Sequence, residues 1–327
     1  MPITPITLDS HILLLAAMVA LHLVLFFTAT GAPCVALLCE RLGQSRKKVF
    51  WDKFALQIAS LGLFTALAVA CLSVANHWLV MHLTSPEGPQ TGILYPAGSL
   101  GPQVVLTAGL FCAALLFLLI YKTTWKALKN SKAFHQLLGL ASVLTALAGL
   151  FFFQLLKQAA FRFPFASYVD PSLSAFLDFI RSPELDAFFW PLLAQSLLLC
   201  LSAAGALGLV YLIFRRKAED YGRDYYLFST RVCAKWALFP CLIQLLALGW
   251  LIFTLKTHLG PLDTGNLPAI FLAAAWGCFL LACLAWIVIV RAENPLRAKA
   301  AMFFGLLLLL LAIFCQAVFL VFVTNVM

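Results

Sequence analysis

Charged residues are scarce in this chain: Asp, Glu, Lys and Arg make up 11% of its 327 residues, whereas hydrophobic residues make up 63%. The mean hydropathy of +0.99 lies far outside the range of a soluble domain. The longest stretches between apolar runs, at about 81–100 and 158–186, are too short to fold as soluble domains. The scarcity of charge therefore excludes a soluble protein and predicts an integral membrane protein.

Apolar runs long enough to cross a hydrocarbon core occur along the whole chain. They lie at about 11–39, 51–80, 101–121, 135–157, 187–214, 235–256, 268–290 and 301–324. Helices of this length satisfy their own backbone hydrogen bonds in lipid. We therefore predict an all-α fold, a polytopic transmembrane helix bundle of about eight spans that forms a single domain over residues 1–327.

The few charges are distributed unevenly. The chain has 22 Lys and Arg against 13 Asp and Glu, a net charge of +9. Most of the basic residues follow spans 1 and 3 or lie between spans 5 and 6 and spans 7 and 8. The positive-inside rule places these loops in the cytoplasm and both termini outside, in the periplasm. We predict a multi-pass protein of a bacterial inner membrane, and read the surplus as a topology signal in a lipid membrane and not as a nucleic-acid site.

Several functional motifs are also missing. The sequence contains no C-x-x-C or C-x-x-C-H motif, so its ten cysteines predict neither a metal ribbon nor covalent c-type haem. No charged residue is expected at the middle of a span, and no internal repeat is evident, which disfavours an ion-coupled transporter. The polar residues expected inside the spans are mostly amides, for which we predict interhelical hydrogen bonds. These are Gln57, Gln154, Gln195, Gln244 and Gln316.

Histidines are the candidate cofactor ligands, because a neutral imidazole is a common axial ligand of haem iron. Four of the six are expected at the outer ends of spans, namely His11, His77, His82 and His258. The side chain of His22 is expected deeper, about ten residues into the first span, and we predict that it binds haem iron. Each histidine also has a structural alternative. The outer four could place their polar ring at the lipid headgroups, and His22 could be a core histidine hydrogen-bonded to a carbonyl. His135 is expected to be an ordinary cytoplasmic flank.

The first two predicted spans carry spaced motifs. His22, Gly31 and Glu40 follow one another at intervals of nine residues in the first. The second opens with Phe-Trp-x-Lys, continues with Leu-Gly-x-x-Thr and ends in an Asn-x-Trp motif. The residues are Phe50, Trp51, Lys53, Leu61, Gly62, Thr65, Asn76 and Trp78. This pattern resembles the N-terminal half of subunit I of the cytochrome bd quinol oxidases, tolerably over residues 1–160 and weakly over 161–327. The resemblance implies that His22 ligates a haem, whereas we expect Glu40 to mark the cytoplasmic edge without meeting His22.

Other features of that family are missing. Leu106 and Ala114 stand where the family has the two carboxylates of its oxygen-site proton path, and Trp190 and Pro191 stand where it has a second haem-ligating histidine. Residues 269–286 contain no methionine, and the connection before them is too short for the family's quinol-binding loop. The resemblance therefore does not extend to oxygen reduction.

The expected function is that of a haem b-bearing, bd-like membrane subunit. It would pass electrons between the quinone pool and a periplasmic partner, such as a c-type cytochrome, as a subunit of a quinol-linked oxidoreductase. Any two of the outer histidines could supply further axial ligands. Two alternatives stay open: a cofactor-free bd-like scaffold that anchors partner subunits, and an unrelated membrane transporter.

Overall fold

The computed structural model describes residues 10–83, 101–128, 130–162, 187–219, 221–259 and 267–326, with a few isolated positions between 177 and 185. Within these ranges the chain is helical and contains no strand. The long helices are α1 (Ser10–Arg46), α2 (Val49–Leu83), α3 (Gly101–Thr123), α4 (Lys132–Arg162), α6 (Phe189–Ala218), α7 (Arg223–Leu259), α8 (Leu267–Arg291) and α9 (Lys299–Val326), with a short 3-10 helix, η1 (Pro295–Arg297), before α9.

Eight helices of the described part are long and apolar enough to cross a membrane. This confirms the predicted all-α fold and the predicted number of spans, and it defines a multi-pass membrane protein of the helical class. The largest difference from the prediction is at α7, which begins at Arg223 and not near residue 235. Hydropathy finds the part of a helix that lies in hydrocarbon, whereas the first turns of α7 are held by the burial of Tyr225 and Tyr226. Arg231, which precedes the predicted span, therefore lies within α7.

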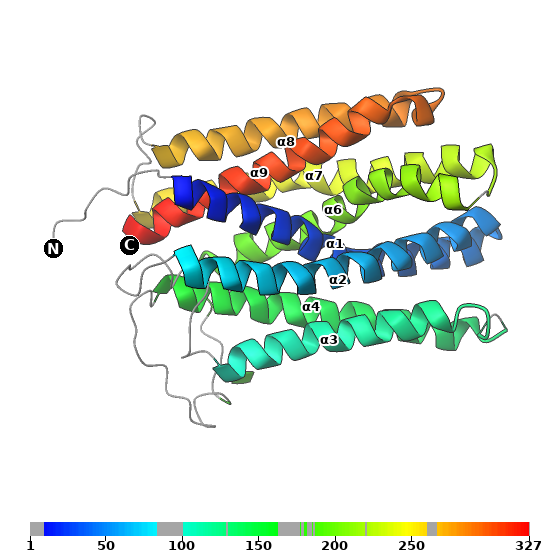
Figure 1. The fold of residues 1–327 in the computed structure, drawn as a ribbon, viewed down its shortest axis with the longest axis horizontal. Helices are drawn as coiled ribbons and strands as arrows, with labels where there is room; N and C mark the ends of the chain where they lie inside the picture. Colours follow the sequence, from blue (N-terminus) through cyan, green and yellow to red (C-terminus); the bar gives the residue numbers. More distant parts are fainter. Residues whose placement is uncertain are drawn as a thin grey trace.

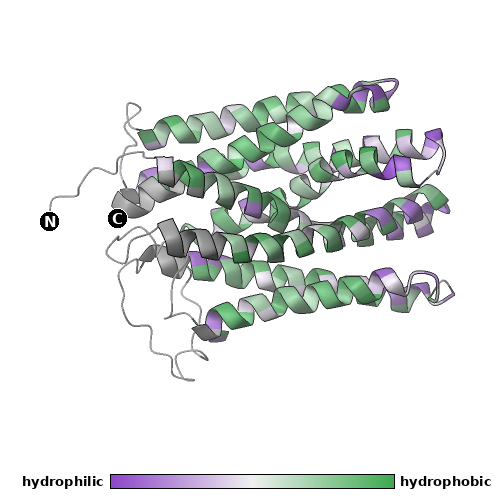
Figure 2. Cartoon of the chain, viewed as in Figure 1, coloured by the Kyte–Doolittle hydropathy of each residue, from purple (hydrophilic) through white to green (hydrophobic). Residues whose placement is uncertain are grey.

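The helices form four antiparallel hairpins, α1/α2, α3/α4, α6/α7 and α8/α9, whose turns lie at the same end of the bundle (Figure 1). Hydrophilic residues gather at this end, whereas the helices are hydrophobic along most of their length (Figure 2). We call the turn end the inner end, because its basic residues predict a cytoplasmic location. The beginning of α1 and the end of α9 lie at the opposite, outer end (Figure 1).

Helix α1 is the centre of the bundle. It packs against α2, α4, α6 and α9, while α6 also contacts α4, α7 and α9. One hydrophobic cluster contains buried side chains from all eight long helices, from Ala20 in α1 to Phe319 in α9. The helices before residue 160 and those after it thus share a core.

Two glycines allow helices to approach closely. A Cβ atom added at Gly31 of α1 would lie 2.1 Å from the carbonyl oxygen of Cys200 in α6. One added at Gly205 of α6 would lie 2.3 Å from the backbone nitrogen of Ala237 in α7. Close backbone contact through small residues is a main source of helix association in lipid. Gly31, which belongs to the spaced motif of the first span, thus has a packing role at the α1–α6 contact.

Replacing Gly31 with alanine is expected to destabilise the bundle, because the added methyl group meets backbone that cannot move without separating α1 from α6. Overpacking of this kind costs about 1–3 kcal/mol. Gly109→Ala is the matched control, because a Cβ atom there meets nothing within 4 Å. Thermal unfolding of the purified variants in detergent should show a lower midpoint for Gly31→Ala alone. Equal midpoints would contradict the assigned contact.

Candidate functional site

The predicted ligand His22 lies in the outer half of α1, within a membrane span. Its side chain is half-buried, and its Nδ1 atom is buried without a hydrogen-bond partner in the described part of the chain. One turn inward, the ring of Phe26 packs against those of Phe111 and Phe153, with centroids 4.8 and 5.1 Å away. His22 is therefore a buried polar group next to an aromatic, apolar cluster, which is a costly arrangement without a partner.

The other four predicted ligands lie on helix segments at the outer end. The backbone of His11 is in the first turn of α1, those of His77 and His82 are near the end of α2, and that of His258 is at the end of α7. Their side chains lie outside the described residues. Because α1 and α2 are joined by Lys47 and Lys48, residues equally far from this turn have similar depths. By this count the backbone of His77 is about one turn, roughly 6 Å, further out than that of His22.

Five glutamines share the unusual state of His22. Each has at least one buried side-chain nitrogen or oxygen without a partner among the described residues. With His22, we call them the outer polar set: His22 (α1), Gln103 (α3), Gln154 (α4), Gln195 (α6), Gln244 (α7) and Gln316 (α9). Buried polar side chains are normally hydrogen-bonded, so such a set calls for a partner.

The contacts between helices indicate the depths of the set. The Ser202 hydroxyl of α6 donates to the carbonyl oxygen of Ala237 in α7, at 2.9 Å. Gln195 and Gln244 both lie seven residues outward from this contact, so they have the same depth on neighbouring helices. Measured from the contact of Gly31 with Cys200, His22 is roughly 6 Å further out than Gln195. Three members of the set, on three helices that pack in sequence, therefore lie within a narrow band of depth.

The prediction of interhelical hydrogen bonds for the five amides is confirmed in part. The Gln154 amide donates to the Ser196 hydroxyl, which joins α4 to α6. The Gln57 amide nitrogen donates to a carboxylate oxygen of Glu219, at 2.8 Å, and its oxygen accepts from the Tyr225 hydroxyl, at 2.5 Å. In Gln244, which is fully buried, neither amide atom has a partner among the described residues. Both amide atoms of Gln57 are thus satisfied, whereas Gln154, Gln195, Gln244 and Gln316 each keep at least one buried atom without a partner among the described residues.

A second polar group lies at the inner end and was not predicted. Glu40, which is fully buried, accepts from the Tyr121 hydroxyl at 2.8 Å and lies 2.9 Å from Nδ1 of His135. The Lys132 ammonium lies 3.3 Å from the same carboxylate and 3.6 Å from that of Asp52. We call Glu40, Tyr121, Lys132 and His135 the inner ionic cluster. It joins α1, α3 and α4.

The structure corrects two predictions here. His135 is 1% exposed, so it is not an ordinary flank. Its ring stacks on Tyr121 at 4.3 Å, and its Nε2 lies 2.8 Å from the Tyr121 carbonyl oxygen. Glu40 does not simply mark the edge of a span, because it is the shared partner of three side chains from other helices. The expectation that Glu40 does not meet His22 agrees with these partners.

The inner ionic cluster combines groups that can balance one another's charge. The carboxylate of Glu40 faces Lys132, and the hydroxyl and imidazole groups satisfy its remaining acceptor sites. A buried carboxylate is tolerated when it is paired and hydrogen-bonded in this way. At the turn between α6 and α7, burial and the charge of Glu219 raise the pKa of Tyr221. These features indicate that the polar groups of the inner end are structural ties between helices.

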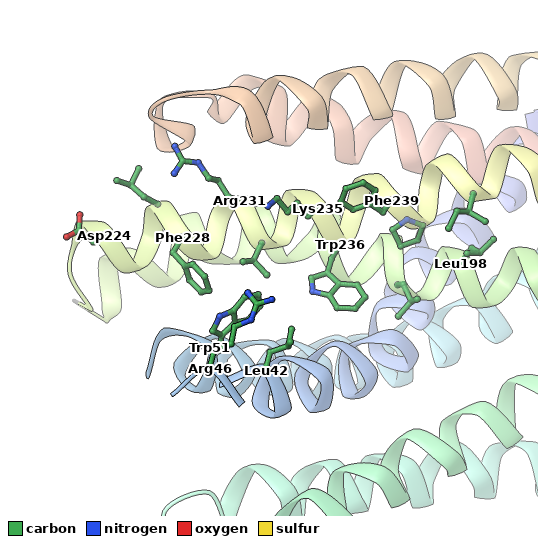
Figure 3. Close-up of a pocket in the computed structure, with 15 residues that line it drawn as sticks. Leu42, Arg46, Trp51, Leu198, Asp224, Phe228, Arg231, Lys235, Trp236 and Phe239 are labelled. Atoms are coloured by element: carbon green, nitrogen blue, oxygen red, sulfur yellow. The ribbon is translucent and has the colours of Figure 1, made fainter. Parts of the chain in front are cut away.

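A groove opens at the inner end between α1, α2, α6 and α7 (Figure 3). Its volume is about 810 Å³, within the range of about 300–1,000 Å³ typical of small-molecule sites. Aromatic and aliphatic side chains form most of its walls, and three basic side chains line its inner part. Sequence patterns did not reveal it, although α7 lines it with residues spaced three and four apart, as one helix face requires.

A scan against protein-family models and a search of curated proteins find no match for this chain. Among the described residues, no three His, Cys, Asp or Glu side chains gather into a group that could hold a metal ion. A haem iron takes at most one protein ligand on each face, so it does not need such a group. The candidate site is therefore His22, with the unpaired amides of Gln195 and Gln244 at similar depths on α6 and α7.

Proposed function

We propose that this chain is a haem b-bearing, bd-like subunit of a membrane electron-transfer complex. It passes electrons between the quinone pool and a periplasmic redox partner, such as a c-type cytochrome, in a bacterial inner membrane. The observation that carries the proposal is the unpaired, buried Nδ1 of His22 in a membrane span. An imidazole in this state is suited to an axial ligand, in which one ring nitrogen binds iron and the other bonds a neighbour.

The side chains near the depth of His22 fit the chemistry of a b-type haem. The ring cluster of Phe26 offers the apolar contact that a porphyrin needs, and the unpaired amides of Gln195 and Gln244 offer hydrogen bonds for polar substituents or water. The second axial ligand would come from His11, His77, His82 or His258, and the depth of His77 on α2 favours that residue. Bound haem supplies one-electron transfer, while the chain contributes ligation, orientation and a low dielectric.

The proposal does not include oxygen reduction. At the positions where the related family has carboxylates, α3 carries Leu106 and Ala114. Ala114 is buried, and its carbonyl oxygen accepts a hydrogen bond from the Ser142 hydroxyl at 2.8 Å, so this part of α3 packs tightly on α4. A site of this kind has no group to deliver protons. This supports electron transfer to another chain.

An optical spectrum of the purified protein tests the proposal. We expect a Soret band, dithionite-reduced α and β bands, and a b-type spectrum after pyridine treatment, with haem in stoichiometric amount. Oxidation of the reduced protein by a quinone analogue would then show the link to the quinone pool. A colourless protein that co-purifies with a redox partner would overturn the haem proposal in favour of a scaffold. Solute transport by a colourless protein in proteoliposomes would favour a transporter.

A further inference from the structure

The groove at the inner end has two chemically different parts. One face of α7 runs along it, from Asp224 through Arg231 and Lys235 to Phe239 and Ile243. The charged residues come first, near the inner end, and the apolar residues follow toward the middle of the bundle (Figure 3). The groove is therefore amphipathic along the length of α7, with its basic part toward the inner end of the bundle.

The charge of the groove is positive. Three cations, Arg46, Arg231 and Lys235, line it together with a single carboxylate, that of Asp224. Within the described residues none of the three cations forms an ion pair at 4 Å or less. Arg231 is positioned by bonds from its guanidinium to the carbonyl oxygens of Ala292 and Glu293, at 3.1 and 2.7 Å. These bonds fix the side chain and leave its charge uncompensated.

The two other cations face the groove from opposite sides. Arg46, at the end of α1, lies 5.8 Å from the centre of the Trp51 ring, and Lys235 lies in the fourth turn of α7 beside Trp236 (Figure 3). Both side chains are exposed. Tryptophan beside lysine or arginine is typical of the membrane–water interface, where the aromatic rings lie at headgroup depth.

We propose that this groove binds an anionic phospholipid of the cytoplasmic leaflet. Its phosphate lies between Arg46 and Lys235, with the charge of Arg231 nearby, and an acyl chain lies along Phe239 and Ile243. Basic pockets between transmembrane helices on the cytoplasmic side are known to select anionic headgroups. The net positive charge favours this ligand over a quinone, whose headgroup is uncharged. The site is distinct from that of His22, which lies 24 residues before Arg46 on α1, roughly 36 Å along the helix.

The test is a lipid titration of the full chain in detergent, read by native mass spectrometry. Phosphatidylglycerol and phosphatidylcholine with identical acyl chains are the probes, and water-soluble glycerol phosphate tests whether the headgroup alone suffices. We expect phosphatidylglycerol to be retained at about tenfold lower concentration than phosphatidylcholine, and glycerol phosphate not to compete. The double variant Arg46→Gln/Lys235→Gln should lose this preference, because each cation near the headgroup contributes to the selection.

Two variants control the experiment. Lys299→Gln removes an exposed cation from the same end of the bundle, outside the groove, and should keep the preference. Lys235→Arg keeps the positive charge in place and should also keep the preference for phosphatidylglycerol. Equal retention of the two lipids by the unaltered protein would overturn the proposal. So would loss of the preference in Lys299→Gln to the same extent as in the double variant, or tight binding of an uncharged quinone analogue that the double variant leaves unchanged.

Discussion

Replacing Glu40 with alanine is expected to lower the free energy of unfolding by about 3–5 kcal/mol, the range for removing one partner of a buried ion pair. The reason is that Glu40 is fully buried and is shared by Tyr121, Lys132 and His135. Its loss leaves a buried hydroxyl and a buried imidazole nitrogen without their partner. It also removes the tie between α1 and the α3/α4 hairpin.

Denaturation of the purified variants in mixed micelles measures this effect. Asp52→Asn is the matched control, because Asp52 also lies near Lys132, at 3.6 Å, but its side chain is one-third exposed. A partly exposed pair contributes about 0–1 kcal/mol, so the control should unfold almost as the unaltered protein does. Glu40→Gln keeps an acceptor and removes the charge, so its loss of unfolding free energy should lie between those of Glu40→Ala and Asp52→Asn. Equal losses of unfolding free energy for Glu40→Ala and Asp52→Asn would show that the inner ionic cluster does not hold α1 to the α3/α4 hairpin.

Replacing His22 with alanine is expected to abolish stoichiometric haem binding if the proposed function is right. The alanine has no donor to iron, and the spectrum of the purified variant should lose the Soret band or show a five-coordinate species. Because the substitution removes a buried polar atom that has no partner among the described residues, the fold itself should be retained. Size-exclusion chromatography and thermal unfolding can check this point separately.

His135→Gln is the control for haem loss. It removes the other histidine whose side chain is described, in the inner ionic cluster, where it should lower stability and leave haem bound. Free imidazole should partly restore the spectrum of His22→Ala, because it can occupy the space of the missing side chain. If both variants keep their haem, His22 is not the ligand. If both lose it, the loss follows from instability and not from ligation.

Much of the fold was predictable, because each span is identified by the hydropathy of its own segment of the sequence. Runs of about 20 apolar residues must be helical in lipid, and the prediction of eight such helices is confirmed. The basic segments were predicted to lie on one side of the membrane, and in the structure they lie at one end of the bundle, where the four turns are. The helix ends were less predictable. Arg231 belongs to α7 because tertiary burial of Tyr225 and Tyr226 extends the helix beyond its apolar run.

The site was predictable to a smaller extent. His22 stood out as a polar residue in an apolar run, and the structure adds that its Nδ1 is buried and unpaired. His135 was missed because its partner Glu40 lies 95 residues away in the sequence. One signal was available: both residues lie at the inner ends of predicted spans, Glu40 directly after the first and His135 at the start of the fourth, and antiparallel spans bring such ends together. The groove left no comparable signal, since four helices contribute to it.

The sequence by itself determined the class of the protein, its eight apolar helices and the uneven distribution of its basic residues, because hydropathy and charge act on each segment independently of its neighbours. Tertiary structure alone decided which polar groups are satisfied. Glu40 and Gln57 have partners because neighbouring helices bring hydroxyl, imidazole and carboxylate groups within 3 Å, whereas Nδ1 of His22 and the amide of Gln244 have none among the described residues. Depth and helix neighbours, which no single segment encodes, separate the structural ties of the inner end from the candidate site of the outer half.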